Sequence, residues 1–270
     1  MRNRPLDLEW PGMDALIGYT GFVGSNLASQ RQFGTLFNSQ NIKEMRGGGF
    51  GLVICAGVQA KKWWANQNPD ADWQGIEKLL EVLKSIRAEK FVLISTVDVY
   101  PNPMGVTEST PIVGDNHVYG DHRFKVEEFV RAHFSQSYVV RLPGLFGPGL
   151  KKNVIFDLLH DNCLNQINPE SVYQYYDLKH LWHDVQLCIE NEIHLLNIAT
   201  EPVHTRDIVE RYFPEHWSHI GAPQSFRMTY DMRSQYGTMW GSHANGYLYD
   251  HSTILREIGE FVSRARATIQ

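Results

Sequence analysis

The chain has 270 residues and a formal net charge of -5, so it is long enough to form one large domain or a domain with a smaller lobe. The acidic balance offers no broad basic surface to a phosphate backbone, which argues against nucleic acid as the main partner. Cys55, Cys163 and Cys188 lack a CxxC spacing, and no apolar run reaches the ~18 residues of a membrane span, so we expect a cytoplasmic protein with reduced thiols and no membrane partner.

The first half of the chain alternates short apolar runs with longer segments of helical apolar spacing. Five runs are predicted to form buried strands, namely ALIGYTG (15–21), GTLFN (34–38), FGLVICAG (50–57), KFVLIST (90–96) and SYVVRLPG (137–144). Three intervening segments are predicted to form helices, namely residues 25–33, 71–87 and 123–134. Because strict alternation of strand and helix implies right-handed crossovers, the predicted fold class is α/β, a Rossmann-type doubly wound parallel sheet.

The pattern loosens after Gly149. Further helices are predicted in KKNVIFDLLHDN and HLWHDVQLCIEN and a returning strand in HLLNIAT, while residues 201–270 mix helix with aromatic-rich loop. We therefore predict a dinucleotide-binding domain at residues 1–148, which residues 177–200 rejoin, and a small C-terminal substrate-binding lobe at residues 149–270. The lobe is expected over the carboxyl edge of the sheet, where ligands bind in this architecture.

The first chemical feature is the turn GYTGFVGSN, with glycines at Gly18, Gly21 and Gly24 between a predicted strand and helix. Gly18 would allow the tight turn, Gly21 would admit a pyrophosphate close to the backbone, and Gly24 would let the helix pack on the strand. The N–H groups at the start of the helix would then face the anion. The alternative is a tight turn without a ligand, but its place on the first turn from strand to helix favours dinucleotide binding.

The end of the second strand bears on the choice between NAD and NADP. An acidic residue there would bind the adenosine ribose of NAD, but this chain reads LFNSQN, with Asn38 and Ser39 at the expected place. A neutral site does not repel a 2'-phosphate, and the cations of Arg31, Lys43 and Arg46 lie close in sequence. The sequence therefore favours NADP, with NAD as the alternative; ordinary surface charge is the other reading of the cations.

Three later stretches join the glycine turn: ISTVDVYP (94–101), YGDHR (119–123) and RLPGLFGPG (141–149). Together, over residues 14–200, the four motifs resemble the extended short-chain dehydrogenase/reductase family, in particular its nucleotide-sugar epimerase, dehydratase and ketoreductase branch. The resemblance implies that Thr96 holds the reacting sugar oxygen, that Tyr119 exchanges its proton, and that the backbone after Pro143 meets the nicotinamide. The predicted cofactor-binding residues are Gly18, Thr20, Gly21, Phe22, Val23, Gly24, Asn38, Ser39, Ala56, Gly57, Ser95, Tyr119, Arg123, Pro143 and Gly144.

The pair of Tyr119 and Arg123 is the predicted acid/base centre. Residues four apart on a helix share a face, so the guanidinium would lie beside the phenol and lower its pKa from about 10 toward neutrality. An exposed surface pair is the alternative. Arg123 is also a departure, because the resembling family has lysine there to hold the nicotinamide ribose, and Lys125 lies on a different helix face.

Asp98 helps to choose among the reactions that the family resemblance implies. In the resembling dehydratases the two residues after the threonine are both acidic, whereas this chain has Val97 and Asp98. Dehydration is therefore disfavoured, although Asp98 could act as a single base or could only stabilise the turn before Pro101. Simple ketoreduction and epimerisation with transient oxidation both remain open.

Cations in the predicted lobe are candidates for a nucleotide diphosphate. Lys151, Asn153 and Arg233 are the predicted substrate-binding residues, and Lys152, Arg206 and Arg227 are further cations there. Trp63 and Trp64, after the third strand, would flank adenine or sugar, or pack beneath a loop. No metal site is predicted, because the histidine pairs His180/His183 and His216/His219 lack a convincing third ligand.

The sequence thus predicts an NADP(H)-dependent oxidoreductase or epimerase acting on a nucleotide-linked sugar, with Tyr119 and Thr96 at its centre. The alternative is a catalytically silent relative that binds a dinucleotide or sugar nucleotide in the same fold; Arg123 and the short second lobe favour that alternative. The family resemblance also implies a homodimer.

Overall fold

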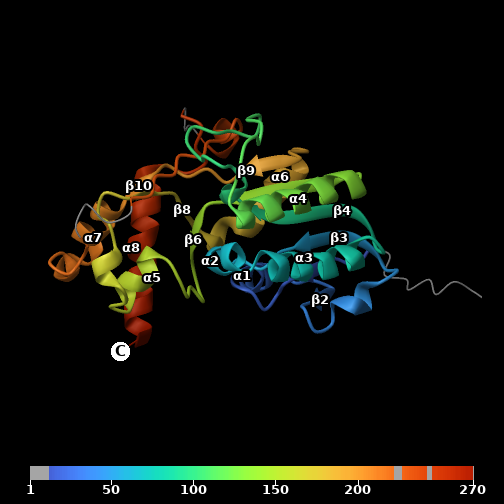
Figure 1. Ribbon diagram of the computed structural model, residues 1–270, viewed down its shortest axis with the longest axis horizontal. Helices are drawn as coiled ribbons and strands as arrows, with labels where there is room; N and C mark the ends of the chain where they lie inside the picture. Colours follow the sequence, from blue (N-terminus) through green and yellow to red (C-terminus); the bar gives the residue numbers. More distant parts are fainter. Residues whose placement is uncertain (1–11, 222–226, 242–244, 270) are drawn as a thin grey trace, which may run out of the picture. The chain divides into compact units, whose positions relative to one another are not determined.

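The computed structural model describes residues 12–221, 227–241 and 245–269 and divides into two compact units (Figure 1). The first unit comprises residues up to Pro101, Ile112–Arg141 and Leu181–Leu196. The second comprises Asn102–Pro111, Leu142–His180 and the chain from Asn197 onward. The predicted boundaries of a cofactor domain and a substrate lobe stay a prediction, because compactness alone says nothing about ligands.

The first unit is built on a six-stranded parallel sheet, which confirms the predicted Rossmann-type fold class. Its strands run in the order β2-β1-β3-β4-β5-β9, so the chain moves from β1 to one side and then returns to the other. The strands are β1 (Ala15–Ile17), β2 (Thr35–Phe37), β3 (Gly49–Cys55), β4 (Arg87–Thr96), β5 (Ser137–Leu142) and β9 (Leu195–Asn197).

Helices cover this sheet, and two of them, α3 and α4, run side by side along it (Figure 1). One sheet face packs Val53, Phe91 and Val139 with Leu83 of α3 and Val130 of α4, all fully buried. This core follows from the alternation of strand side chains, which sends every second residue to the same face. The helices of the unit are α1 (Phe22–Gln30), α2 (Lys62–Gln67), α3 (Pro69–Leu83), α4 (Val118–His133) and α6 (Leu181–Glu190).

Two predicted boundaries differ from the structure for local reasons. α4 begins at Val118 rather than at residue 123, because His117 caps it by accepting the Gly120 N–H on Nδ1 at 3.0 Å. α3 ends at Leu83 rather than at residue 87, because β4 begins at Arg87, which pairs with Gly49 of β3. Strand pairing with a distant segment overrides the local helical pattern there.

The second unit has its own apolar core, formed by helices and two small sheets. β6 pairs with β8 in parallel, and β10 pairs with β7 in antiparallel orientation. Fully buried Phe146, Phe213 and Ile258 belong to this core. The elements of the unit are β6 (Gly144–Phe146), β7 (Val172–Tyr173), β8 (Tyr175–Asp177), β10 (Val203–His204), α5 (Val154–Leu159), α7 (Thr205–Tyr212) and α8 (His251–Ile269).

Short 3-10 turns complete both units. One of them, η2 (Val97–Val99), follows β4 directly and carries Asp98. The others are η1 (Ile42–Met45), η3 (Leu164–Gln166), η4 (Leu178–His180), η5 (Pro214–His216) and η6 (Gly237–Trp240). Within the described parts of the chain, no helix combines the length and the apolar character needed to cross a membrane.

The three cysteines are free thiols, and their exposure predicts unequal reactivity. Cys163 is exposed, Cys188 is buried, and burial raises the pKa of Cys55 to about 11. Because the thiolate is the reactive species, we expect one thiol per native chain to react rapidly with Ellman's reagent and three to react after unfolding in guanidinium. Rapid native reaction of a second thiol would contradict this burial pattern.

Candidate functional site

The predicted site residues of the first unit follow the carboxyl ends of four neighbouring strands. β1 pairs in parallel with β2 and with β3, and β3 pairs in parallel with β4. The segments after these strands therefore meet at one edge of the sheet. The strand order reverses at β1, because β2 lies on one side of β1 and the later strands follow on the other side. Open α/β sheets bind ligands at such a switch point.

The glycine turn after β1 has the geometry that a pyrophosphate needs. Gly18 has φ +87° and a Cβ on it would lie 2.5 Å from the Ala56 carbonyl oxygen, so only glycine fits against the turn after β3. A Cβ on Gly24 would lie 2.1 Å from the Gly18 carbonyl oxygen. Gly21 is the N-cap of α1 and provides no side-chain cap, and the first turn of α1 has no acidic residue. These free helix-end N–H groups fit the phosphates of a dinucleotide.

The segment after β2 carries no carboxylate, as expected from the sequence. Asn38 stabilises the local turn, because its Oδ1 accepts the Gln40 N–H at 2.9 Å, and Ser39 is exposed. Lys43 and Arg46 are exposed in the next segment. The suggestion that Arg31 binds a 2'-phosphate is not supported, because its guanidinium pairs with Asp14 and lies over the Trp182 ring at 4.3 Å.

Tyr119 lies in the first turn of α4, and its side chain is 7% exposed. Its backbone N–H donates to Asn66 Oδ1 at 3.0 Å, which ties the start of α4 to α2. Thr96, at the end of β4, lies close enough to its phenol to lower the phenol pKa. The structure thus brings together the two residues that were predicted to hold and protonate a substrate oxygen.

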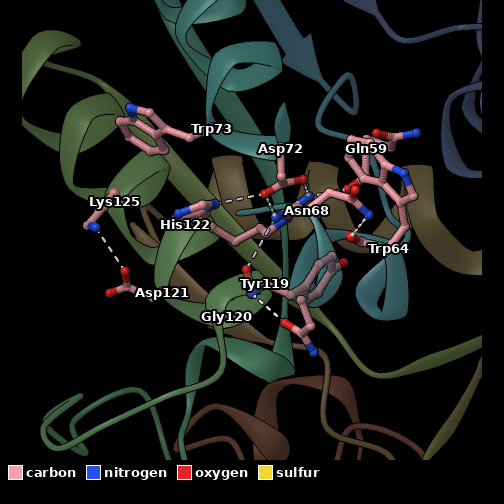
Figure 2. Close-up of polar contacts among 12 residues, drawn as sticks. Gln59, Trp64, Asn68, Asp72, Trp73, Tyr119, Gly120, Asp121, His122 and Lys125 are labelled. Atoms are coloured by element: carbon pink, nitrogen blue, oxygen red, sulfur yellow. Dashed lines mark hydrogen bonds and ion pairs between the residues drawn. The ribbon is translucent and has the colours of Figure 1, made fainter. Parts of the chain in front are cut away.

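Arg123 lies beside Tyr119, but its guanidinium is committed to a buried carboxylate. Its Nη1 and Nη2 donate to Asp72 of α3 at 2.5 Å and 2.8 Å, and Nη2 also donates to the Gln59 carbonyl oxygen at 2.5 Å. Asp72 also bonds His122 Nδ1 at 2.8 Å (Figure 2). The guanidinium carbon lies 4.0 Å from the centroid of the Tyr119 ring, over its face. Arg123 therefore supports the phenol ring from a buried ion pair.

The predicted lowering of the Tyr119 pKa is wrong for the protein without ligands. Burial raises the pKa of Tyr119 to about 12, and the nearby Arg123 cation and the Thr96 hydrogen bond offset only part of this rise. The carboxylates of Asp98 and Asp72 raise this pKa further. Asp72 also partly neutralises Arg123, which weakens the field that the guanidinium exerts on the phenol. The phenol is therefore protonated at neutral pH.

Asp98 follows Thr96 by two residues and carries two basic neighbours. Its N–H donates to Thr96 Oγ1 at 3.2 Å, and its Oδ1 lies 2.8 Å from Lys62 Nζ and 3.9 Å from His117 Nε2. Burial and the neighbouring Lys62 ammonium lower the pKa of His117. Lys62 therefore provides the positive charge beside Asp98 at neutral pH.

Ser95 and the arginine of the RLP motif belong to a buried network beneath this edge. The Ser95 hydroxyl donates to Glu127 Oε1 at 2.6 Å, and Arg141 donates to both oxygens of Glu127 at 3.0 Å and 2.6 Å. Arg141 also donates to the Tyr100 hydroxyl at 2.6 Å. The hydroxyl proton of Ser95 thus serves this network, while consecutive Thr96 faces the other side of the strand.

Gly120 allows α4 to approach η2 closely, which leads to a stability prediction. A Cβ on Gly120 would lie 2.1 Å from the Asp98 carbonyl oxygen and 2.3 Å from Asn116 Nδ2. Gly120→Ala should therefore lower the free energy of unfolding by about 1–3 kcal/mol in a urea titration and displace Tyr119. Gly75 is an exposed residue of α3, and nothing lies within 4 Å of a Cβ placed on it. Gly75→Ala should therefore leave the free energy of unfolding unchanged or raise it by about 0.5–1 kcal/mol. Equal effects of the two substitutions would refute the close-approach argument.

Five predicted residues, Pro143, Gly144, Lys151, Asn153 and Arg233, lie in the second unit. Pro143 is buried, and Gly144 begins β6 with its N–H donating to the Gln174 carbonyl oxygen at 3.0 Å. Lys151 is exposed. Asn153 caps α5, because its Oδ1 accepts the Phe156 N–H at 3.1 Å while its Nδ2 donates to Leu145. Arg233 pairs with Asp231 at 3.1 Å and lies over the Tyr247 ring.

Sequence reasoning missed Asp72, His117 and Lys62 as members of this site. Each looks ordinary in sequence, since Asp72 is an acid in the first turn of a helix and Lys62 is one of two adjacent lysines. Trp63, on α2, is 63% exposed rather than packed beneath a loop. In the described residues no three histidine, cysteine or acidic side chains are grouped to hold a metal ion.

Comparison with known proteins decides the family. The model of the NAD dependent epimerase/dehydratase family matches residues 31–170, a segment that contains Thr96, Asp98, Tyr119 and Arg123. The chain belongs to this family. The assignment confirms the resemblance inferred from the motifs, and the match begins after the glycine turn. A search of curated protein sequences found no match.

Solved structures share the fold at low sequence identity. A UDP-glucose 4-epimerase from Thermotoga maritima, with UDP-glucose, has a TM-score of 0.70 and 16% identity over 96% of this chain and 100% of that chain. A dTDP-glucose 4,6-dehydratase from Streptomyces venezuelae, with NAD bound, has a TM-score of 0.70 and 14% identity over 94% and 97%. A dTDP-4-dehydrorhamnose reductase from Bacillus anthracis, in complex with NADP, has a TM-score of 0.68 and 14% identity over 95% and 99%.

Proposed function

We propose that the protein is an NADP(H)-dependent reductase or epimerase that acts on a nucleotide-linked sugar. The observation that carries the proposal is the buried phenol of Tyr119, which lies beside Thr96 at the carboxyl edge of the sheet. Thr96 would hold the reacting oxygen of the sugar while Tyr119 exchanges a proton with it. The family assignment and the nucleotide sugars named for related folds, such as UDP-glucose, support this substrate class.

The protonation state of Tyr119 supports a role as proton donor. A dinucleotide, when bound, would supply the hydride. Reduction of a ketone also needs a proton on the carbonyl oxygen, and a phenol with a pKa of about 12 holds its proton at neutral pH. Dehydration is not proposed, because Val97 stands where an acid/base pair would need a second carboxyl group beside Asp98.

The residues at the carboxyl edge fit a dinucleotide. Gly18, Gly21 and Gly24 would take the pyrophosphate at the start of α1, and Asn38 and Ser39 would face the adenosine ribose. NADP is favoured because residues 38–41 after β2 are neutral and the next segment exposes Lys43 and Arg46. The remaining proposed cofactor contacts are Thr20, Phe22, Val23, Ala56, Gly57, Ser95, Tyr119, Pro143 and Gly144. Arg123, which the sequence also suggested, is held by Asp72 and Gln59 and is not proposed to contact the cofactor directly.

Substrate binding would draw on the second unit. Exposed Lys151 is available to a diphosphate. Asn153 and Arg233 already bond Phe156 and Asp231, so binding a diphosphate would have to compete with these partners. The homodimer implied by the family stays a prediction.

The test is a pair of measurements on the purified protein. NADPH and NADH binding is measured by calorimetry, and we expect NADPH to bind at least about tenfold more tightly. NMR then follows oxidation or epimerisation of UDP-glucose, UDP-glucuronic acid and dTDP-glucose, and reduction of their 4-keto derivatives. Absence of binding to either dinucleotide would refute the proposal.

A silent binding protein is the second candidate, and the Arg123 geometry favours it. Arg123 is held by Asp72 and Gln59, so its guanidinium is not available to hold the nicotinamide ribose. This candidate predicts dinucleotide binding without turnover of any substrate in the panel.

A further inference from the structure

Arg123 is poorly placed to contact a ligand directly. Its two terminal nitrogens donate to Asp72, Gln59 and the Tyr119 carbonyl oxygen, and its Nε is buried without a hydrogen-bond partner among the described residues. To bind a ribose diol through its terminal nitrogens, Arg123 would have to leave the Asp72 carboxylate. Breaking a buried ion pair is strongly unfavourable. The ligand-facing cation of the site must therefore come from elsewhere.

Lys62 meets the requirements that Arg123 does not. It begins α2, in the segment after β3, and its Nζ lies 2.8 Å from Asp98 Oδ1, in the turn after the adjacent strand β4. The Lys62 side chain is 36% exposed and that of Asp98 is 17% exposed, so both are open to solvent. An ammonium has three donors, and the Asp98 bond uses one of them.

Asp98 connects Lys62 to the acid/base centre. Its backbone N–H donates to the Thr96 hydroxyl, and Thr96 lies beside the phenol of Tyr119. His117 cannot replace Lys62 as the cation, because its Nδ1 accepts the Gly120 N–H and its pKa is lowered by burial and by Lys62 itself. The chain thus keeps a lysine at the reactive end of the site, although on α2 and not on α4.

We propose that Lys62, oriented by Asp98, is the cation that contacts the ligand at this site and donates hydrogen bonds to sugar hydroxyl oxygens. The inference rests on the proposed function. Two ligands present such hydroxyls, the nicotinamide ribose of the dinucleotide and the hexose of the nucleotide sugar, and separate binding measurements distinguish them.

The test compares Lys62→Met with Lys61→Met, which removes the same charge from the adjacent exposed position. Calorimetry gives the affinity for NADPH, and a second titration gives the affinity for UDP-glucose in the presence of saturating NADP+. Loss of a charge-assisted hydrogen bond should weaken one of the two about tenfold or more. Weaker NADPH binding assigns Lys62 to the ribose, and weaker UDP-glucose binding assigns it to the hexose. Lys62→Arg, which keeps the charge, should recover part of the loss.

The outcomes separate this inference from the proposed function. If the wild-type protein binds no dinucleotide, the proposed function fails and the Lys62 assignment fails with it. If the wild-type protein binds NADPH and UDP-glucose, but Lys62→Met equals Lys61→Met in both titrations, the Lys62 assignment alone is overturned. Circular dichroism melting of each variant shows that an affinity loss does not reflect unfolding.

Discussion

Tyr119→Phe should lower the rate of hydride exchange by about 10²- to 10⁴-fold, the range that a positioned general acid contributes. The substitution removes only the hydroxyl beside Thr96 and leaves the ring over which Arg123 lies. The glycine turn and the start of α1 are untouched, so NADPH affinity should change less than about threefold. Single-turnover kinetics with the best substrate from the panel, beside NADPH calorimetry, measure the two quantities.

Tyr138→Phe is the matched control for this substitution. Tyr138 is also a buried tyrosine, with its hydroxyl bonded to Gln136, but it lies near the start of β5, at the edge of the sheet opposite the glycine turn. The same chemical change there should leave the rate within about twofold of wild type. If Tyr119→Phe retains full turnover, Tyr119 is not the acid/base of this enzyme.

The fold could be predicted because its signals are local. The glycine turn, the apolar strand runs and the helical spacing each occupy fewer than 20 residues, and strict alternation then implies a parallel sheet. The ends of elements were less predictable where a distant partner decides them. Arg87 illustrates this, since pairing with Gly49 draws it into β4.

The site could be predicted only as far as its motifs extend. Tyr119 and Arg123 were placed together because a helix brings residues four apart onto one face. The charge environment depends on Asp72, 51 residues before Arg123, and no sequence period connects α3 to α4. From the sequence alone the guanidinium is expected to lower the phenol pKa; burial, with smaller contributions from the Asp98 and Asp72 carboxylates, raises it instead.

Local hydrogen bonds explain why another residue predicted to bind substrate has a structural role in the protein. Asn153 was chosen because it stands with two lysines directly after GPGL, yet it also precedes the apolar start of a helix, where asparagine is a preferred N-cap. That signal was present in the sequence and indicates a structural role. Lys62 carried no such signal, because its partner Asp98 lies on the next strand's loop.

Asp72→Ala should have the largest effect on stability, lowering the free energy of unfolding by about 3–5 kcal/mol. It leaves the buried guanidinium of Arg123 without its carboxylate and removes the partner of His122 (Figure 2). Burial raises the pKa of Asp72, but the hydrogen bonds from Arg123 and His122 outweigh it, so the pKa is lowered overall. The charge of Asp72 therefore stabilises the fold fully above its ordinary pKa of 3.8, and this contribution is lost as the pH falls through the lowered value.

Asp121→Ala is the control for Asp72→Ala, because it breaks an ion pair on the surface of α4 instead of a buried one. Asp121 is 49% exposed and pairs with Lys125 at 2.8 Å, so its removal should cost about 0.5 kcal/mol or less. Urea titrations at pH 7 and at pH 3 measure both variants against wild type. The deficit of Asp72→Ala should shrink at pH 3, because the wild-type protein begins to lose the same charge there. If Asp72→Ala loses no more unfolding free energy at pH 7 than Asp121→Ala does, the Asp72 ion pair does not hold Arg123 in place. Arg123 could then leave Asp72 and contact a ligand.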